Sequence, residues 1–468
     1  MSIYNLVIVG TGLSSAAALA ATLDKDINIL IVDVNAHHRP NLSELELNDL
    51  EKLHNGRKNF YGSDFATRIL SEDNVAKGID KGAYSHGGFS NIWGGSLDNI
   101  DPKIFSNLGI DLTDDTKKIL NHVFGDFYLE SNGANQKNYD VLSKSSSWEV
   151  AKSKLAVNRN KCTSCNLCLY GCYESAIFNS YDFIMRIINS KMKKSRIDIM
   201  SSIYVDKINE EANQVSLECV EYKSNKKMSI KTERLFVGAG VFPTAKIFLR
   251  SFSSLNQIEI RDSSYFALPV FCANSTSHLT SGIALSSISA KYHDNLKYKY
   301  ALQLYFPSKY TVNEVATRLR RFSVPNMFSS IIAGRVGIIQ GYKHSNISNS
   351  LILSKSKGVI VSREVLRSGS FFENELTTKI KDLFKHSGVI PIIKLKVNTN
   401  VTDGYHFGAS FPHLSGAYNE CESDRLGRPF GLKKIHIIDS SVLPFIPSGS
   451  HSLTMMANSY RIAKETYL

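Results

Sequence analysis

The first 33 residues contain the pattern that most restricts how this chain can fold. An apolar run at residues 6–9 leads into Gly10-Thr11-Gly12-Leu13-Ser14-Ser15, and alanine-rich sequence follows. The run predicts a buried parallel strand, and residues 15–23 predict a helix. A second apolar run, residues 27–32, ends in Asp33. Strand, glycine turn, helix, strand and terminal acid in this order predict a dinucleotide-binding fold.

Each position of the turn has an expected role. Gly10 allows the tight turn, and Gly12 lets the backbone approach a pyrophosphate at the N-terminus of the helix. The third position holds Ser15, a small side chain where Gly or Ala is usual. Asp33 follows Gly10 at the distance expected of an acid that accepts hydrogen bonds from ribose hydroxyls. These residues predict a dinucleotide but do not distinguish FAD from NAD.

Length and charge limit the class of protein. A chain of 468 residues exceeds what one hydrophobic core usually supports, so we expect two domains. The formal charge of +12 is spread along the chain, with small basic groups at residues 191–196 and 223–227. Neither group contains interleaved aromatic residues, so we expect no nucleic-acid partner. A basic solvated surface, or attraction to an anionic substrate, an acidic partner or a membrane surface, accounts for the charge.

Targeting signals are not evident in the sequence. No apolar run approaches the roughly 20 residues that a membrane span needs, so we expect none. The N-terminus leads directly into the first strand and shows no secretory pattern, and we therefore expect a cytoplasmic protein.

A second glycine-rich segment, residues 86–97, follows the dinucleotide pattern. Gly87 and Gly88 precede Ser90, Asn91 and Trp93. Two glycine pairs around small polar residues favour backbone packed closely against a flat ligand, with a glycine-rich surface loop as the alternative.

This segment resembles the flavin-contacting loop of the glucose–methanol–choline oxidoreductase family, nearest to its pyranose oxidase and sugar dehydrogenase branch. In some members a histidine of this loop is joined covalently to the flavin, but Ile92 stands at that position here, so the resemblance implies non-covalent FAD. Residues 235–245 and 435–444 match two further segments of the family. The resemblance therefore implies that five more residues contact FAD or lie beside it: Val205, Ala239, Gly240, Asp439 and Ser440.

The same resemblance implies a catalytic histidine. Substrate oxidation in this family needs a base for the hydroxyl proton while a hydride passes to flavin N5, and histidine suits that task. His406 aligns with the family's catalytic histidine, although Ala409 and Ser410 replace Gly and Thr after it. The second active-site residue, normally Asn or His, falls at Ser450, with His451 next to it. Both remain candidates.

Four of the seven cysteines are closely spaced. Cys162, Cys165, Cys168 and Cys172 form the C-x2-C-x2-C-x3-C run of bacterial ferredoxins, although Tyr173 replaces the usual proline. The run predicts one iron–sulfur cluster, 4Fe–4S or 3Fe–4S. Structural zinc and a metal-free site are the alternatives. The odd number of cysteines, four of them closely spaced, argues against a disulfide framework.

These observations imply an FAD-dependent dehydrogenase. It is expected to oxidise a hydroxyl of a sugar, polyol or related alcohol and to pass electrons through the cluster to an external acceptor protein or carrier. The alternatives are a cluster-free alcohol or sugar oxidase that uses oxygen, and a flavin-binding redox protein without alcohol turnover.

The expected fold class is α/β. A Rossmann-type FAD-binding domain is expected from residues 1–105, 160–255 (with the cysteine segment 160–175) and 400–468. A discontinuous α+β substrate or cap domain, built on an antiparallel sheet, is expected from 106–159 and 260–399. Within it, strands are expected at 300–306, 330–336 and 350–354, and a helix at 371–387. Four aromatic residues could stack on a sugar or belong to the core: Tyr305, Phe306, Tyr310 and Tyr342.

Overall fold

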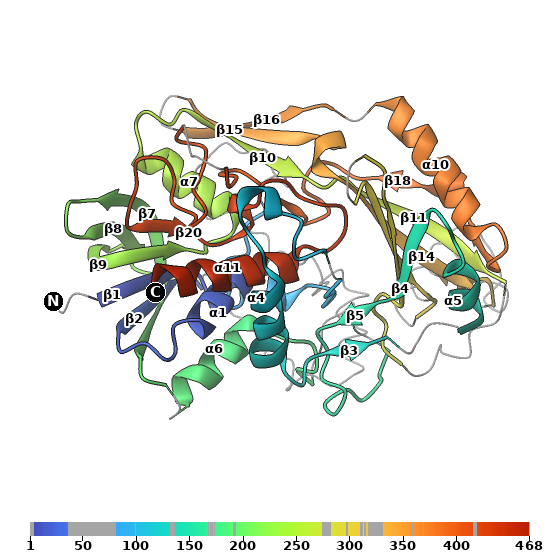
Figure 1. The fold of residues 1–468 in the computed structure, drawn as a ribbon, viewed down its shortest axis with the longest axis horizontal. Coiled ribbons are helices and arrows are strands. Elements are labelled where there is room, and N and C mark those ends of the chain that lie inside the picture. The colour runs from blue at the N-terminus through green and yellow to red at the C-terminus, as the bar shows by residue number, and fades with distance from the viewer. Residues whose placement is uncertain are drawn as a thin grey trace.

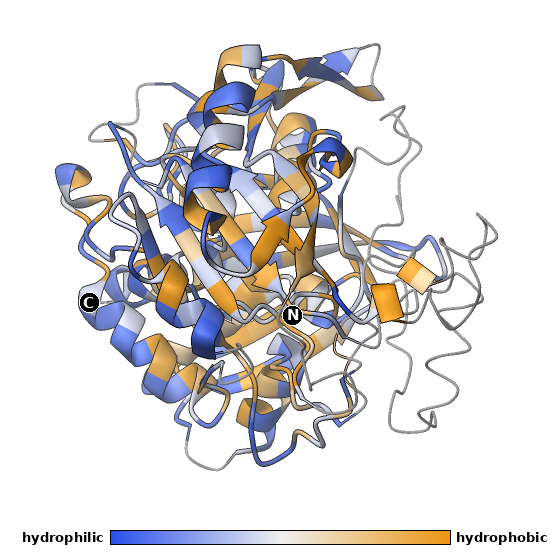
Figure 2. Cartoon of the chain, turned by 90° about the vertical axis from the view of Figure 1, so that its right-hand side faces the viewer, coloured by the Kyte–Doolittle hydropathy of each residue, from blue (hydrophilic) through white to orange (hydrophobic). Residues whose placement is uncertain are grey.

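The computed structural model describes residues 4–35, 81–98, 100–131, 136–166, 168, 172, 174–190, 193–273, 282–295, 298–308, 312, 315–316, 331–356, 359–367, 369–414 and 419–467. Two large sheets lie next to each other along the long axis of the molecule (Figure 1). Both chain ends lie beside the first of them. Hydrophobic residues gather on the central strands, and the surrounding helices carry both hydrophobic and hydrophilic residues (Figure 2).

The first sheet is formed by the N-terminal strands together with later segments. Its order is β6-β2-β1-β9-β8-β7, and β20 pairs with β9. The strands β6, β2, β1, β9 and β20 run parallel, whereas β8 is antiparallel to β7 and β9. The bounds are β1 Tyr4–Val9, β2 Asn28–Asp33, β6 Arg196–Ser201, β7 Ile203–Glu210, β8 Val215–Glu221, β9 Lys227–Val237 and β20 Ile435–Ile437. The two predicted N-terminal strands are confirmed.

Helices cover this sheet. The helix α1 (Leu13–Ala20) contacts α6 (Ser180–Asn189) and α11 (Ser452–Thr466), and α7 (Val241–Ser251) packs on β7. Residues 13–19 of α1 are all buried, because alanine and serine let the helix approach its neighbours closely. The predicted helix after the glycine turn is confirmed.

The second sheet is antiparallel, with the order β17-β11-β14-β13-β12-β4 and β18 paired with β11. Its bounds are β4 Trp148–Lys152, β11 Tyr265–Cys272, β12 Ile288–Tyr292, β13 Tyr300–Tyr305, β14 Val336–Lys343, β17 Val389–Pro391 and β18 Val397–Asn398. The helix α10 (Ser370–Phe384) packs on one face through Leu376, Ile380 and Leu383. An antiparallel sheet and the helix expected near 371–387 are thus both present.

Smaller elements complete the described chain. A four-stranded sheet has the order β16-β15-β10-β19 and lies along the upper edge in Figure 1. Its strands are β10 Gln257–Asp262, β15 Ser350–Ser356, β16 Val359–Val365 and β19 Phe407–Gly408. The strands β3 (Leu129–Glu130) and β5 (Lys154–Leu155) pair separately. Further helices are α4 (Thr113–Lys118), which continues into a π-helix at Ile119–Phe124, and α5 (Gln136–Leu142).

One strand prediction was wrong, and one predicted strand lies in another sheet than expected. Residues 331–333 are helical and β14 begins only at Val336; Ile331 is 57% exposed, so this apolar run is not strand core. The predicted strand at 350–354 exists as β15 but belongs to the four-stranded sheet, because Leu351 and Leu353 pack into the core of the first sheet. The 106–159 segment contributes to both parts of the structure. Leu112 and Phe124 pack in the core of the first sheet, whereas β4 pairs with β12 in the second sheet.

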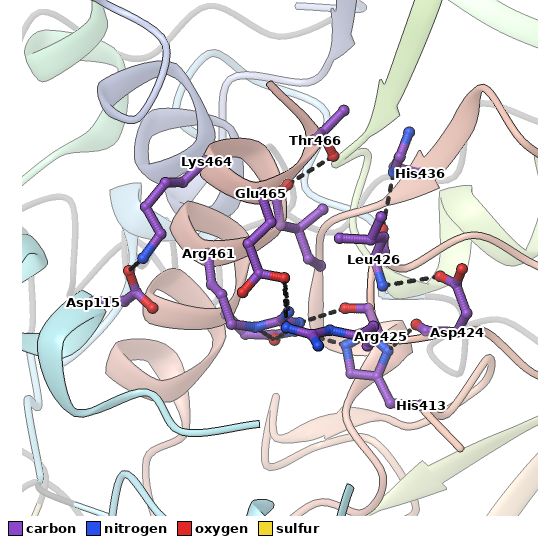
Figure 3. Close-up of polar contacts among 12 residues, drawn as sticks. Asp115, His413, Asp424, Arg425, Leu426, His436, Arg461, Lys464, Glu465 and Thr466 are labelled. Carbon is purple, nitrogen blue, oxygen red and sulfur yellow. Dashed lines mark hydrogen bonds and ion pairs between the residues drawn. The ribbon is translucent and has the colours of Figure 1, made fainter. Parts of the chain in front are cut away.

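The last helix is held by a buried polar network (Figure 3). Arg461 is 2% exposed and donates to Asn458 Oδ1, to Arg425 O and to Glu465. His413 donates from Nδ1 to Asp424 O (2.6 Å) and accepts at Nε2 from the Asn458 amide (3.0 Å). Because both His413 nitrogens are bonded within the network, this histidine has a structural role.

No helix within the described ranges is both long enough and apolar enough to cross a membrane.

Candidate active site

A large pocket opens where β1, β2, β9 and β20 end. Its empty volume is about 870 Å³, part of it open to solvent. Segments distant in sequence line it: residues 10–14 and 33, 81–83 and 88–90, 238–241 and 243, 405–407, 439–440, and 451, 452 and 455. We call it the dinucleotide pocket. The pocket therefore joins the glycine turn, the second glycine-rich segment and the C-terminal histidines.

Glycines shape the floor of this pocket. Gly10 has φ +96°, and a Cβ there would lie 2.5 Å from Gly238 O. At Gly12 and Gly240 a Cβ would meet nothing within 4 Å, so both border open space. Gly12 precedes α1 and Gly240 precedes α7, so two helix N-termini begin at the pocket. Backbone N–H groups at helix N-termini suit a pyrophosphate, and FAD carries one.

Asp33 is buried and partly engaged by the chain itself. Its Oδ2 accepts a hydrogen bond from Thr11 Oγ1 (2.7 Å), and its Oδ1 accepts one from the Asn35 amide (2.9 Å). Burial raises its pKa to about 6, against the lowering effect of these hydrogen bonds. Thr11 Oγ1 in turn accepts the Gly87 N–H (2.9 Å). Asp33 thus lines the pocket and is bonded to Thr11, the side chain that connects the two glycine-rich segments.

The second glycine-rich segment is folded by its own polar residues. Gly87 has φ +85°, and a short 3-10 helix spans Gly88–Asn91. The Asn91 amide group donates to Ser85 Oγ, His86 O and Gly88 O. Gly88 and Ser90 line the dinucleotide pocket, whereas Asn91 does not. The structure therefore assigns Asn91 to shaping the loop.

Asp439 joins the last strand of the first sheet to α7. Its Oδ2 accepts from the Gly240 amide (3.0 Å) and from Thr244 Oγ1 (2.7 Å), and its Oδ1 accepts from the Ser441 amide (2.9 Å). Burial raises the pKa of this carboxyl, although the hydrogen bonds oppose the shift. Asp439 and Ser440 both line the pocket, so Asp439 holds the start of α7 against it.

Two histidine rings meet at the wall of the pocket. The His406 and His451 ring centroids lie 5.3 Å apart, edge to face, and Tyr342 stacks on His406 at 4.3 Å. Burial lowers the pKa of His451 to about 4. Burial, and then the neighbouring His451, lower the pKa of His406 well below its usual value. Both rings are therefore neutral near pH 7, and each carries one ring nitrogen without a proton.

The Nδ1 atoms of the two rings share one feature. His406 Nδ1 and His451 Nδ1 are buried and form no hydrogen bond among the described residues. Buried polar atoms are normally satisfied, so an unpaired pair beside a pocket suits a polar ligand.

The side chains of Ser450 and His451 have different surroundings in the structure. The Ser450 hydroxyl donates to Ser96 O (3.0 Å) and does not line the pocket, whereas His451 does. The residue next to His406 is therefore His451.

Several other predicted residues lie away from the pocket lining. Ser15 packs against Gly238, where a Cβ would come within 2.7 Å of its Oγ. Trp93 donates from Nε1 to Phe178 O (2.9 Å). Val205 is buried in β7, paired with Cys219 at the edge of the first sheet. Gly87 contacts Asn179 instead of lining the pocket.

The four clustered cysteines share a second cavity, which we call the four-cysteine pocket. Its empty volume is about 370 Å³, and Cys162, Cys165, Cys168 and Cys172 all line it. Backbone amides donate to two of the sulfurs, Ala284 N to Cys168 Sγ (3.3 Å) and Ala176 N to Cys172 Sγ (3.2 Å). None of the seven cysteines forms a disulfide. Within the described ranges no three His, Cys, Asp or Glu side chains are grouped to hold a metal ion, so a metal site is not shown.

The inner face of the second sheet approaches the histidines. Tyr342, which stacks on His406, shares this face with Gln340, and Gln303 lies directly opposite Gln340. Gln303 Nε2 donates to Ser96 Oγ and Asp98 Oδ2, both at 3.0 Å. Tyr305 also lies on this face, whereas Phe306 packs in the core under α10, and Tyr310 lies outside the described residues.

Sequence reasoning missed several residues of the site. Thr11 stands between the two glycines and could have been noticed by its hydroxyl. Lys81 lines the dinucleotide pocket, ion-paired with Asp403 at 3.2 Å. Asn179 and Ser180 contact the second glycine-rich segment, and an Asn before a helix is a recognisable cap. No local signal indicated which distant segment they would contact.

Comparisons with known proteins identify the fold. No protein-family model matches the chain, and no curated protein matches it. Among solved structures, pyridoxine 4-oxidase from Mesorbium loti matches with a TM-score of 0.65 over 99% of both chains at 13% sequence identity. The chain shares its fold. At this identity the likeness concerns the fold alone, and it agrees with the predicted α/β class.

Proposed function

We propose that the chain is a member of the glucose–methanol–choline family, an FAD-dependent oxidoreductase that oxidises a CH–OH group. The observation that carries the proposal is the neutral pair His406 and His451 on the wall of the dinucleotide pocket. The neighbour named pyridoxine 4-oxidase has the same fold over the full chain, which supports this choice.

The pocket residues fit FAD. Open space beside Gly12 and Gly240 leaves room for the pyrophosphate, and Asp33 lines the same pocket, as an acid that accepts hydrogen bonds from a ribose would. Ile92 offers no atom for a covalent link to flavin, so binding is non-covalent. When bound, FAD supplies a hydride acceptor at N5.

The two histidines have different roles toward the substrate hydroxyl. His406 takes the hydroxyl proton, because burial keeps its ring neutral, and Tyr342 holds that ring in place by stacking. His451 hydrogen-bonds the same hydroxyl and orients it. Two rings this close do not both become charged, so the pair accepts one proton in total. The first turn of α11, which His451 precedes, adds a partial positive charge at this end of the pocket.

Substrate recognition falls to the inner face of the second sheet. Gln340 is partly exposed there and accepts a hydrogen bond from the Tyr342 hydroxyl (3.4 Å). Its amide N–H group suits an additional hydroxyl of the substrate. Gln340 and the Tyr342 hydroxyl give this face polar groups, which we call the polar wall. Such a wall supports a sugar, polyol or related alcohol as the substrate class.

We further propose that electrons leave through an iron–sulfur cluster held by Cys162, Cys165, Cys168 and Cys172. Four thiols around one cavity, with backbone amides on two sulfurs, are a donor set suited to such a cluster. A one-electron acceptor protein or carrier completes the reaction. Direct reduction of oxygen is the second candidate, favoured by the name of the structural neighbour.

The test of the oxidation step is anaerobic bleaching of the flavin by a panel of sugars, polyols and other alcohols. We expect at least one of them to bleach it, and His406→Ala to bleach far more slowly. If no alcohol reduces the flavin, the chain is a flavin-binding redox protein without this turnover. A His406→Ala variant as fast as wild type would show that the base is another residue.

The electron exit needs a separate measurement. Iron and sulfide analysis, with an EPR spectrum of anaerobically purified protein, distinguishes the two exits. A cluster signal that appears on addition of substrate supports the dehydrogenase. A flavin spectrum without iron, together with hydrogen peroxide formation in air, identifies an oxidase.

A further inference from the structure

The four-cysteine pocket and the dinucleotide pocket are joined by one short piece of chain. Cys172, Ala176 and Ile177 line the four-cysteine pocket. Residues 178–180, which follow directly, contact the segments around the dinucleotide pocket. Three peptide units separate Ile177 from Ser180, a distance of at most about 11 Å.

Each of these three residues binds a different part of the glycine-rich segments. Phe178 O accepts the Trp93 Nε1–H (2.9 Å), and the Asn179 amide donates to Asn91 Oδ1 (2.8 Å). These bonds hold the second glycine-rich segment from its far side.

Ser180 makes the most direct connection. Its N–H donates to Ser90 Oγ (3.1 Å), and its hydroxyl donates to Thr11 O (2.8 Å) with Gly87 O also in range (3.1 Å). Ser90 lines the dinucleotide pocket, and Thr11 is part of the Rossmann turn that lines it. Ser180 is fully buried. A shift of Ser180 would therefore move both glycine-rich segments.

The connection has little freedom. Asn179 caps α6 by accepting the amides of Tyr181 (2.9 Å) and Asp182 (3.2 Å). A Cβ at Gly87 would lie 2.9 Å from Asn179 Oδ1, so the contact is close. At its other end, Ala176 is tied to Cys172 Sγ by its amide. Both ends of residues 176–180 are thus fixed, one to Cys172 and the other to the segments around the dinucleotide pocket.

We propose that an iron–sulfur cluster in the four-cysteine pocket and FAD in the dinucleotide pocket stabilise each other's binding through residues 176–180. The inference rests on the proposed function, because it requires FAD as the ligand. A cluster bound at Cys172 fixes Ala176 through its amide, which positions Phe178, Asn179 and Ser180, and these position the FAD-binding backbone. Binding couplings are reciprocal, so FAD must strengthen binding of the cluster by the same factor.

The experiment compares FAD binding with and without iron. Anaerobically purified full-length protein is divided, and iron is stripped from one part with ferricyanide and a chelator. The FAD dissociation constant is then measured by flavin fluorescence. We expect it to rise about 5- to 150-fold in the iron-free protein, the usual range of coupling between sites. Iron release to a chelator should be slower when FAD is bound.

Three variants make the test specific. Cys168→Ser should lose iron and bind FAD as weakly as stripped wild type. Ser180→Ala should keep iron but show a smaller change in FAD affinity when iron is stripped, because its hydroxyl bond to Thr11 O is lost. The bond from its backbone N–H to Ser90 Oγ remains, so the change should be reduced and not abolished. Cys421→Ser removes a thiol outside the pocket and should change neither quantity. If Cys168→Ser does not fold, stripped wild type supplies the same comparison.

The outcomes separate this inference from the proposed function. FAD binding within twofold in iron-loaded and stripped protein overturns the coupling and leaves the oxidoreductase proposal intact. Wild type that binds FAD but no iron overturns the coupling as well. Protein that binds iron but no FAD overturns the proposed function, and the coupling with it.

Discussion

Thr11 donates a 2.7 Å hydrogen bond to Asp33, the acid at the end of β2. The same hydroxyl oxygen accepts the Gly87 amide, so a single side chain connects two glycine-rich segments 76 residues apart. Asp33 thereby contributes to the shape of the dinucleotide pocket as well as to the contacts expected with a ribose.

Thr11→Val removes this hydroxyl and keeps the shape of the side chain. The Gly87 amide loses its acceptor and Asp33 loses a donor, a cost of about 1–2 kcal/mol in the bound state. We expect the FAD dissociation constant to rise about 5- to 30-fold, measured by flavin fluorescence. Thr22→Val, whose hydroxyl bonds only Leu19 O at the other end of α1, is the matched control. Equal FAD binding in both variants would contradict the role given to Thr11.

His406→Ala should lower the rate of substrate oxidation by about 10²- to 10⁴-fold, the usual contribution of a general base. FAD content should remain unchanged, because neither glycine-rich segment is altered. Stopped-flow bleaching of the flavin measures the rate. His451→Ala should also be slow, and the double variant should lose much less than the product of the two effects, because the rings act on one proton. The exposed His386→Ala serves as control; independent, multiplicative losses would argue against a shared role.

Buried histidines should make folding stability depend on pH. Burial lowers the pKa of His436 to about 4, while an unfolded histidine titrates near 6.5. Below pH 6.5 His436 becomes protonated in the unfolded chain but stays neutral in the folded protein. The free energy of unfolding therefore falls from pH 6.5 to 4. Urea denaturation at several pH values measures this fall. In His436→Asn it should be smaller by about 3 kcal/mol. An identical pH profile in the variant would refute the assignment.

Asp262 should have the opposite effect. It is 1% exposed, and burial raises its pKa to about 8. The unfolded chain loses its proton near pH 4, so this residue costs the wild type stability increasingly from pH 4 to 8. Asp262→Asn removes that cost, and we expect the variant to be more stable by about 4 kcal/mol at pH 7. Little difference is expected at pH 4. A variant that is less stable at both pH values would disprove this account.

Gln340→Leu tests the polar wall of the second sheet. Loss of one hydrogen bond to a substrate hydroxyl should raise KM about 5- to 20-fold with little change in kcat, because the contact is equal in ground and transition states. Steady-state kinetics on a polyol or sugar measure both constants. Gln257 lies at the exposed start of β10, and Gln257→Leu is therefore the control variant. An unchanged KM would show that the substrate does not reach Gln340.

Much of the fold could be predicted from local pattern. The apolar runs of β1 and β2 and the glycines between β1 and α1 depend on interactions within a few residues, and the structure has them as expected. The apolar run at 331–333 wrongly predicted a strand from the same kind of local pattern. Tertiary packing leaves Ile331 exposed, and the strand begins at Val336.

The sequence by itself determined the Rossmann turn, the four spaced cysteines and the presence of histidines near the C-terminus, because each follows from residue identity and spacing. Only the tertiary structure decided between Ser450 and His451. These neighbours point different ways, and contact with Ser96 on a distant segment takes the serine hydroxyl and leaves the histidine beside His406. The same holds for Asn91 and Trp93, whose partners on residues 178–179 lie more than 80 positions along the chain. Contacts between segments so far apart depend on how the elements pack, and no local pattern encodes them.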